Sequence, residues 1–336
     1  MAGVTISENF DTEVTSTMRN YLEQTPIDQI FDGNLLLGIL FTGEIPGGGR
    51  VAPGRVRRED GGREVAIPVA YKRSSNITAF QGMDTISLNA DEVATIARAP
   101  WSYYVDSVIL TKQEFWENRG SNALFSILEA RTNMSRRTIA ERVNTDLHST
   151  GDGLSTAPKN IIGIQSLLPL DPSTGTVWGL DRNVYSWWGS YGNDPSQKFS
   201  VGGLNKLGLA YLQTSGTNAE DPFHLALTTP TQWSLYHDQV TAKQQITTTK
   251  IGDRGYPTLE YMGRPIFHSS LVPTGTWFML NMDYAVLCLQ NGVDFTVSQA
   301  TPPANQVIHS IWQIFFSGQF GFERYDRQGR VFFDAE

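Results

Sequence analysis

The sequence has a single cysteine among its 336 residues, Cys288, which lies in the apolar run Tyr284–Leu289. One cysteine cannot form a disulfide framework or a cysteine-based zinc site within one chain. Its apolar neighbours indicate that the thiol packs as a small buried hydrophobic group. Both of these stabilising devices are therefore excluded.

Long hydrophobic runs are also absent. The longest runs, such as Leu35–Phe41 and Ile311–Phe316, are far shorter than the roughly 20 apolar residues that a membrane helix needs. Residues 1–20 carry acids and no apolar core, so they do not form a secretory signal. We expect a soluble protein of a reducing compartment that has no membrane partner.

Positive charge is scarce. The chain has 26 Lys and Arg against 34 Asp and Glu, which gives a formal net charge of −8. A protein that binds nucleic acid by neutralising phosphates needs an excess of basic residues. The composition therefore speaks against a general nucleic-acid-binding protein.

Motifs that would indicate catalysis are missing as well. GxxxxGK[ST], GxGxxG after a strand, HExxH and GxSxG do not occur. For each of the five histidines, a surface or core position is favoured over a metal or catalytic role; these are His148, His224, His237, His268 and His309. Trp178, Trp187 and Trp188 suggest a sugar-binding platform, but core packing or an intersubunit contact is favoured. We expect no catalytic, cofactor-binding or metal-binding residue, and a carbohydrate-active enzyme is the weaker alternative.

The residues that are present favour a folded chain that is β-rich or α+β over a helical bundle. The sequence is 40% hydrophobic and 11% aromatic, which supports a sizeable core, and its 31 glycines and 16 prolines indicate many turns. The longest uninterrupted element is a helix predicted over 118–150, because no Gly or Pro occurs between Ser121 and Thr150. Its apolar stripe includes Leu128, Ile139 and Val143. About 30 helical residues span about 45 Å, so this helix would cross the whole molecule as a spine.

A glycine-rich hairpin is predicted over 43–85. Its clear strand is Glu64–Lys72, in which Pro68 favours an edge position, and we expect the partner strand at Asn76–Phe80. In 43–82, basic residues outnumber acidic ones by seven to four, and we expect them to pair with acids of neighbouring subunits. Such a long hairpin with little core is improbable in a compact monomer, so we interpret it as a loop that other subunits complete.

The rest of the chain alternates strands and helices. The first 42 residues contain a short helix at Thr12–Glu23 and the apolar patch Leu35–Phe41, which packs either on its own core or on a neighbouring subunit. Tyr103–Thr111 is predicted as a strand buried on most of both faces. Further expected elements are helices at Val201–Thr214 and Pro230–Gln244 and strands at Pro222–Thr229, Thr258–Pro265, Ile266–Ser269, Thr276–Leu289, Gln306–Glu323 and Val331–Phe333.

This order of parts resembles the major capsid proteins of tailed double-stranded DNA bacteriophages, which have the Hong Kong 97-type fold. The resemblance covers nearly the whole chain. It also extends to the local sequences VILTKQEFWENRG, IIGIQSLL, GLDRNVYSWWGS, DPFHLALTTPTQWSLYHDQV and TLEYMGRPIFHSSLVPTGTWFMLNMDYAVL.

The resemblance implies an N-terminal arm (1–42), an extended β-hairpin loop (43–85), a peripheral domain (86–170 and 296–336) and an axial α/β domain (171–295). It also implies a non-enzymatic protein whose pentamers and hexamers close into an icosahedral shell around the phage DNA, which it contacts without sequence specificity. Such a shell forms the virion capsid and assembles in the cytoplasm of the host bacterium. A shell of the same fold around protein cargo, or that of a gene-transfer particle, is the related alternative.

Expected partners are further copies of the chain, a portal protein, a separate scaffolding protein and a decoration protein. The candidate contact residues between subunits are Leu36, Leu37, Leu40, Phe41, Arg57, Arg58, Val65, Ile67, Val69, Tyr71, Arg136 and Arg137.

Overall fold

The computed structural model describes residues 35–45, 49–50, 56–77, 79–82, 84, 92–117, 127–151, 160–216, 220–242, 259–298 and 309–335. The predicted helix Thr12–Glu23 and the first part of the predicted spine, 118–126, lie outside these residues. The chain divides into two compact units. The smaller unit includes Tyr104–Arg142 and Gly292–Phe316, and the larger unit includes Leu35–Tyr103, Val143–Asn291 and Ser317–Glu336.

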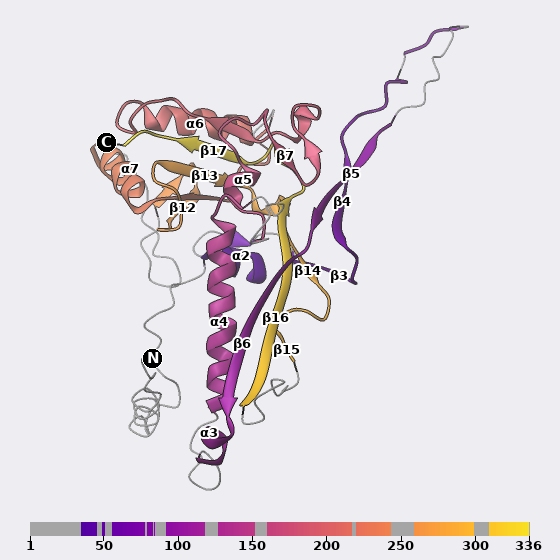
Figure 1. Cartoon of the computed structure of the whole chain (residues 1–336). Coiled ribbons are helices and arrows are strands. Elements are labelled where there is room, and N and C mark those ends of the chain that lie inside the picture. Colours follow the sequence, from indigo (N-terminus) through magenta and orange to yellow (C-terminus); the bar gives the residue numbers. More distant parts are fainter. Residues whose placement is uncertain are drawn as a thin grey trace. The chain divides into compact units, whose positions relative to one another are not determined.

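The larger unit is built around a six-stranded sheet (Figure 1). Its strands are β9 (Tyr191–Asn193), β10 (Leu225–Thr228), β11 (Leu259–Tyr261), β12 (Arg264–His268), β13 (Thr276–Leu280) and β17 (Gly329–Phe332). They are ordered β11-β12-β10-β13-β17-β9, with parallel pairing only in β10–β12 and β17–β9. Strands β10 and β13 are buried along their whole length, as expected for strands that are covered on both faces.

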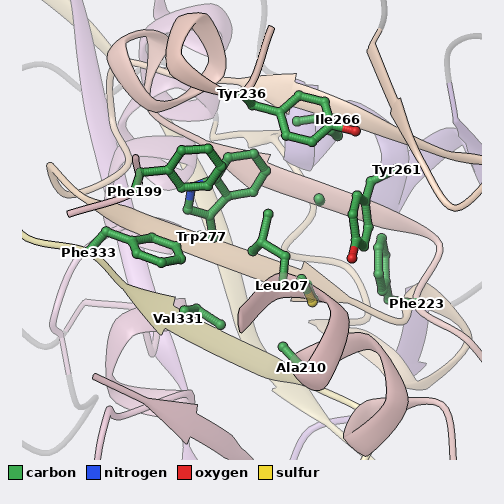
Figure 2. Close-up of a cluster of buried hydrophobic side chains, with 12 residues drawn as sticks. Phe199, Leu207, Ala210, Phe223, Tyr236, Tyr261, Ile266, Trp277, Val331 and Phe333 are labelled. Carbon is green, nitrogen blue, oxygen red and sulfur yellow. The ribbon is translucent and has the colours of Figure 1, made fainter. Parts of the chain in front are cut away.

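Two helices, α6 (Gly203–Thr214) and α7 (Pro230–Ala242), cover one face of this sheet. Their inward side chains join those of the strands in one buried cluster (Figure 2). At its centre the Trp277 ring stacks on Phe199, with centroids 5.6 Å apart, and Tyr236 of α7 approaches it edge-on at 5.9 Å. Helix α7 begins where the sequence predicts, because Pro230 needs no hydrogen-bond acceptor in the first turn.

A second sheet lies partly in the larger unit. Strand β14 (Ala285–Gln290) pairs antiparallel with the end of β16 (His309–Phe322) and parallel with β3 (Val56–Glu59). Cys288 is fully buried on β14, and burial raises the pKa of its thiol to about 12. The thiol therefore stays protonated, and the prediction of a buried hydrophobic cysteine is confirmed.

The smaller unit packs the helix α4 (Ile127–Leu147) on the strand β6 (Ser102–Thr111), which pairs with β16. On α4, Ser135 donates a hydrogen bond to Asp106 of β6, and Arg131 donates to the carbonyl oxygen of Ile109 at 3.0 Å. Short strand β15 (Thr296–Val297) also pairs with β16. The predicted spine stripe is confirmed for the described residues, since Ser135 and Ile139 are buried on the covered face.

The junction between β6 and the short helix α3 (Lys112–Glu117) is fixed by a capping box. The Thr111 hydroxyl accepts from the N–H of Glu114 at 3.2 Å, and the Glu114 carboxylate accepts from the N–H of Thr111 at 2.8 Å. Partial burial alone would raise the pKa of Glu114, but the hydrogen bonds from Arg131 and Thr111 lower it overall. The carboxylate therefore stays charged and ties α3 to α4 through Arg131.

Three predicted details are wrong. The partner of β4 (Glu64–Ala70) is β5 (Ala94–Pro100) and not Asn76–Phe80. The inward side chains of β5 include Ala97 and Ala99, whose small size weakens the alternating hydrophobic signal. The spine helix ends at Leu147, since a tighter i→i−3 bond from His148 closes its last turn.

The third error concerns β6, which is buried on one face only. Val105 and Ile109 are 57% and 52% exposed. Helix α4 covers the opposite face, and a continuous apolar run in the sequence does not show that only one face is covered.

Candidate assembly surfaces

The hairpin strands β4 and β5 form an antiparallel ribbon in which Val65 faces Ala99 and Ile67 faces Ala97. These four side chains are buried within the chain. Val65 and Ile67 are therefore core residues of the subunit. Their predicted role as intersubunit contacts does not fit this burial.

The other two candidates on this strand are also engaged inside the subunit. Val69 is half-buried, and the ring of Tyr71 stacks on Trp187 at 5.1 Å between centroids. Trp178 and Trp188 are only 2% exposed, so they do not form a sugar-binding platform. The aromatic segment instead anchors the base of the hairpin.

The hairpin exposes different side chains further along. Among the described residues of the tip, Ile77 is 85% exposed and Phe80 is 69% exposed, so both present apolar side chains to solvent. The sequence interpretation missed them because it assigned this segment to a strand inside the hairpin.

The apolar patch near the N-terminal end of the described chain is an internal element. It forms helix α2 (Leu35–Thr42), which packs on β14. Leu36, Leu37 and Leu40 are buried in the subunit, whereas Phe41 is 39% exposed. Of the two alternatives from the sequence, packing on the chain's own core therefore describes the three leucines, and their role as contact residues stays an untested prediction.

The four candidate arginines lie on the surface. Arg57 and Arg58 belong to β3, and Arg57 pairs with Glu59 of the same strand at 2.9 Å. Arg136 and Arg137 are exposed on α4. A second subunit could reach these positions. We therefore retain the four arginines as proposed contact residues between subunits.

An uncharged sheet surface is exposed in the smaller unit. Tyr104 of β6 and Phe316 of β16 lie on the covered face, where their rings are 6.1 Å apart. Alternation along the strands then places Val105, Ile109 and Phe315 together on the opposite, exposed face. Tyr103, Ser107, Ile311, Gln313 and Thr296, the partner of Phe315, are further described residues of that face, and none of these five is charged. We call Val105, Ile109 and Phe315 the exposed sheet face.

Helix α6 has a second apolar surface. Its outer side carries Leu209 and Leu212, which are 49% and 59% exposed, while Leu207 packs inward. The neighbouring helix α7 instead presents polar side chains such as Ser234 and Asp238 to solvent. The two helices that cover one face of the sheet therefore differ on their outer sides. The outer side of α7 is polar, whereas that of α6 exposes two leucines to solvent.

Buried ionisable groups are held by structural contacts. Arg182 is fully buried; it donates to the carbonyl oxygens of Trp188 and Leu167 at 3.1 and 2.6 Å, and its guanidinium lies over the Tyr325 ring. Burial lowers the pKa of His148, so this imidazole is neutral at pH 7. Among the described residues, no group of three His, Cys, Asp or Glu is arranged to hold a metal ion. No described helix has the length and apolar character of a membrane span.

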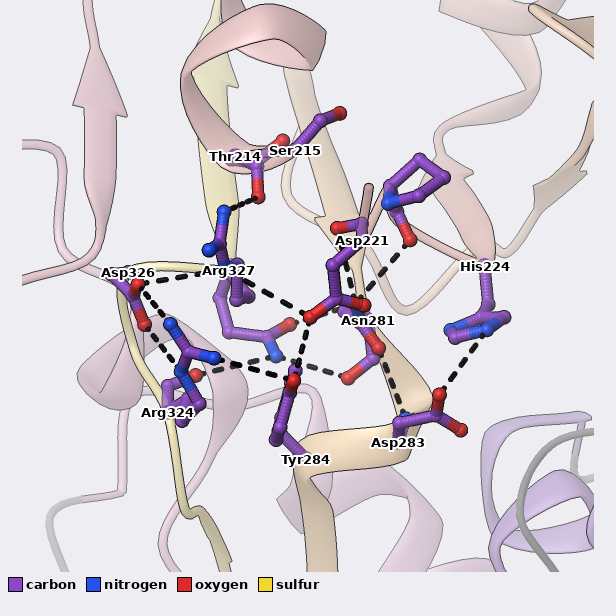
Figure 3. A network of polar contacts seen from close by, with 12 residues as sticks. Thr214, Ser215, Asp221, His224, Asn281, Asp283, Tyr284, Arg324, Asp326 and Arg327 are labelled. Atoms are coloured by element: carbon purple, nitrogen blue, oxygen red, sulfur yellow. Dashed lines mark hydrogen bonds and ion pairs between the residues drawn. The ribbon is translucent and has the colours of Figure 1, made fainter. Parts of the chain in front are cut away.

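A polar network joins three segments of the larger unit (Figure 3). At its centre, Asp221 accepts hydrogen bonds from the Tyr284 hydroxyl at 2.6 Å and from the Asn281 amide nitrogen at 2.8 Å. Arg327 lies 3.8 Å from the same carboxylate. Arg324 donates to Tyr284 and forms an ion pair with Asp326.

No protein-family model matches the sequence, and no curated protein matches it. Solved structures match over nearly the whole chain. The capsid of Cyanophage A-1(L) superposes with a TM-score of 0.64 at 14% identity, covering 94% of this chain and 97% of that one. The encapsulin SrpI of Synechococcus elongatus PCC 7942 gives 0.58 at 10% identity, with 96% and 98% covered. The capsid of a native GTA particle gives 0.58 at 11% identity, with 92% and 100% covered.

The chain has the Hong Kong 97-type fold. The matched structures are a phage capsid, a GTA capsid and an encapsulin, and the resemblance in fold stated from the sequence is confirmed at this level. The identities of 10–14% show the shared fold alone. Within this Hong Kong 97-type chain, the hairpin tip, the exposed sheet face and the outer side of α6 are three apolar surfaces that the described residues leave uncovered.

Proposed function

We propose that this chain is the major capsid protein of a tailed double-stranded DNA bacteriophage. Its copies assemble as pentamers and hexamers into an icosahedral shell around the genome, in the cytoplasm of the host. The observation that carries the proposal is a pair of exposed apolar surfaces on one chain: the hairpin tip with Ile77 and Phe80, and the exposed sheet face. Because these surfaces differ, contacts between them are head-to-tail, and such contacts form closed rings when the rotation between successive copies closes.

We further propose that the hairpin tip of one subunit contacts the exposed sheet face of a neighbour. Such a contact would bury the apolar side chains of both surfaces. Phe41, Arg57, Arg58, Arg136 and Arg137 are exposed, and they are proposed as contacts with further subunits at other surfaces of the chain. A portal protein, a separate scaffolding protein and a decoration protein are proposed as further partners, on the resemblance alone.

A shell around protein cargo or a gene-transfer particle is the second candidate. It is favoured by the encapsulin and GTA structures that share the fold. The contents of purified particles distinguish the candidates. Nuclease-protected DNA of genome length supports the phage capsid, short DNA fragments support a gene-transfer particle, and protein cargo without DNA supports a compartment.

Negative-stain electron microscopy with light scattering tests shell formation directly. We expect closed particles, or free pentamers and hexamers, from the expressed protein with its scaffolding protein. A monomer that persists at high concentration with scaffold added would contradict the proposal.

A variant pair tests the proposed contact. Ile77→Glu/Phe80→Glu should abolish particles while the subunit stays folded. The matched control Ser74→Glu/Ala79→Glu adds the same charge to exposed positions of the same tip without removing an apolar group. Equal loss of particles in both variants would show that charge, and not the apolar contact, is responsible.

A further inference from the structure

A two-stranded ribbon with one break runs from the six-stranded sheet into the part of the second sheet that lies in the larger unit. Strands β13 and β17 pair in the six-stranded sheet, and their continuations β14 and β16 pair in the other sheet. The pairing breaks between Met279–Gly329 and Ala285–Phe322, where residues 280–284 lie opposite residues 323–328. One side of the ribbon has an extra residue here, and the ribbon changes direction, as it does at a β-bulge (Figure 1).

Side chains replace the backbone ladder at this break. The Gln328 amide oxygen accepts from the N–H of Asn281 at 2.9 Å, and its amide nitrogen donates to the carbonyl oxygen of Asn281 at 3.0 Å. The Arg324 guanidinium lies over the Tyr284 ring, 5.1 Å from its centroid. The direction of the ribbon therefore depends on a few side chains and not on an unbroken ladder.

Asp221 contacts both sides of the break from a third segment, the loop between α6 and β10. It accepts from Asn281 and Tyr284, which lie on the β13–β14 side. It also lies 3.8 Å from Arg327, which lies on the β16–β17 side. Figure 3 shows the carboxylate between these groups. Without it, the two sides are joined at the break by the contacts of Gln328 and Arg324 and by the backbone hydrogen bond from the N–H of Glu323 to the carbonyl oxygen of Tyr284.

We propose that Asp221 is a positioning residue that sets the angle between the two sheets of the subunit. A subunit that joins rings of different size must meet its neighbours at different angles, so a fixed internal angle limits the curvatures that the shell can adopt. This consequence for assembly rests on the proposed shell function. The effect on the sheets themselves concerns the single chain and is independent of it.

Distances between two spin labels on the unassembled chain test the effect directly. A cysteine at Ser234 places one exposed label on α7, which packs on the six-stranded sheet, and a cysteine at Arg57 places the other on β3 of the second sheet. The native Cys288 is buried and stays unlabelled. We expect Asp221→Ala to widen the distance distribution by about twofold, because Asn281 and Tyr284 lose their common hydrogen-bond acceptor and Arg327 loses a nearby carboxylate. The matched control Asp238→Ala removes an exposed carboxylate on α7 and should leave the width unchanged.

A second variant shows whether Asp221 acts through its hydrogen bonds. Tyr284→Phe removes only the hydroxyl that donates to Asp221, and it should widen the distribution less than Asp221→Ala. The double variant should widen the distribution by less than the sum of the two single effects, since in the absence of Asp221 the hydroxyl can lose only the hydrogen bond that it accepts from Arg324. An unchanged width in Asp221→Ala, or additive widening in the double variant, would overturn the positioning role. If Asp221→Ala does not fold, Asp221→Asn and Tyr284→Phe give the same comparison.

The particles then test the consequence for assembly. Asp221→Ala particles should show a broader range of radii by electron microscopy than wild-type particles. Wild-type protein that forms no particles would contradict the proposed function and leave the distance result standing. Widened distances together with an unchanged range of radii would overturn the link between the sheet angle and the curvature.

Discussion

At the scale of single residues, the fold uses buried polar side chains to join segments that are far apart in the sequence. The side-chain oxygen of Gln319 on β16 accepts from the N–H of Ile162 at 2.8 Å. Its amide nitrogen donates to the carbonyl oxygen of Pro100, also at 2.8 Å. One fully buried amide thus holds the segment after the spine and the end of the hairpin against the same strand.

Gln319→Leu should therefore be strongly destabilising. The side chain keeps a similar volume, but the N–H of Ile162 is left buried without an acceptor. We expect the free energy of unfolding to fall by about 2–4 kcal/mol, measured by urea denaturation. Gln313→Leu, at an exposed position of the same strand, is the control and should change it by less than about 0.5 kcal/mol. Similar losses in both variants would contradict the role of Gln319.

Asp221 should give a pH-dependent contribution to stability. Partial burial alone would raise the pKa of its carboxyl, but the hydrogen bonds from Tyr284 and Asn281, with Arg327 and Arg324 nearby, lower it overall. A carboxyl with a lower pKa in the folded chain stabilises it fully above the unfolded pKa of about 3.9. That stabilisation is lost as the pH falls through the folded pKa.

We expect the stability difference between wild type and Asp221→Asn to be full at neutral pH and to shrink below about pH 4. Thermal unfolding over a pH series measures it. Asp238→Asn, which changes an exposed carboxylate, serves as the control. A difference for Asp221→Asn that stays constant with pH would show that the charge of Asp221 is not the cause.

At the scale of elements, the hairpins at Thr176–Asp181 and Leu259–His268 have the same two-residue turn. The first residue of the turn is buried in one hairpin and exposed in the other. Trp178 and Gly179 have φ of 52° and 73°, and Met262 and Gly263 have φ of 52° and 75°. Two positive φ angles in a two-residue turn favour Asn-Gly over any bulky residue. The Trp178 indole is buried and donates to the carbonyl oxygen of Phe320 at 3.3 Å, whereas Met262 is 63% exposed.

Met262→Asn should therefore raise the free energy of unfolding by about 0.5–1 kcal/mol, because it relieves the strain and loses little burial. Trp178→Asn in the matched turn should lower it by about 3 kcal/mol, because it leaves a large cavity. Urea denaturation of both variants makes the comparison. A loss of stability in Met262→Asn would mean that its exposed side chain contributes to the fold.

At the scale of the whole molecule, the proposed contacts between subunits are apolar. Ile77 and Phe80 of the hairpin tip and the uncharged exposed sheet face are expected to associate by the hydrophobic effect, which weakens on cooling. Assembly followed by light scattering should therefore increase between about 5 and 25 °C and depend little on salt. Assembly that weakens on warming, or that falls steeply with salt, would indicate that the surface arginines dominate the contacts.

Much of the fold could be predicted from the sequence because local signals were strong. The spine was recognised from its stripe of apolar residues, and Pro230 marked the start of α7. The partner of β4 was missed because Ala97 and Ala99 give only a weak hydrophobic alternation in the sequence. The pairing also joins two segments that are separated along the chain, and local sequence does not specify such a pairing. The predicted limits of the arm, hairpin, peripheral and axial segments stay predictions.

The candidate contact residues were harder to predict, because an apolar residue looks the same whether it faces the core or a neighbour. Val65 and Leu36 are fully buried inside the subunit, while Val105 and Ile109 are exposed. All four lie in apolar sequence contexts. Only the packing of α2 on β14, and of α4 on a single face of β6, separates the two groups.

The sequence by itself determined the fold class, the absence of disulfides and the long helix, since these follow from composition and from periodicity within one segment. The tertiary structure alone decided which apolar surfaces remain uncovered and where polar groups such as Gln319 and Asp221 meet their partners. These outcomes depend on contacts between residues that are far apart in the chain. No local pattern of side chains specifies such contacts.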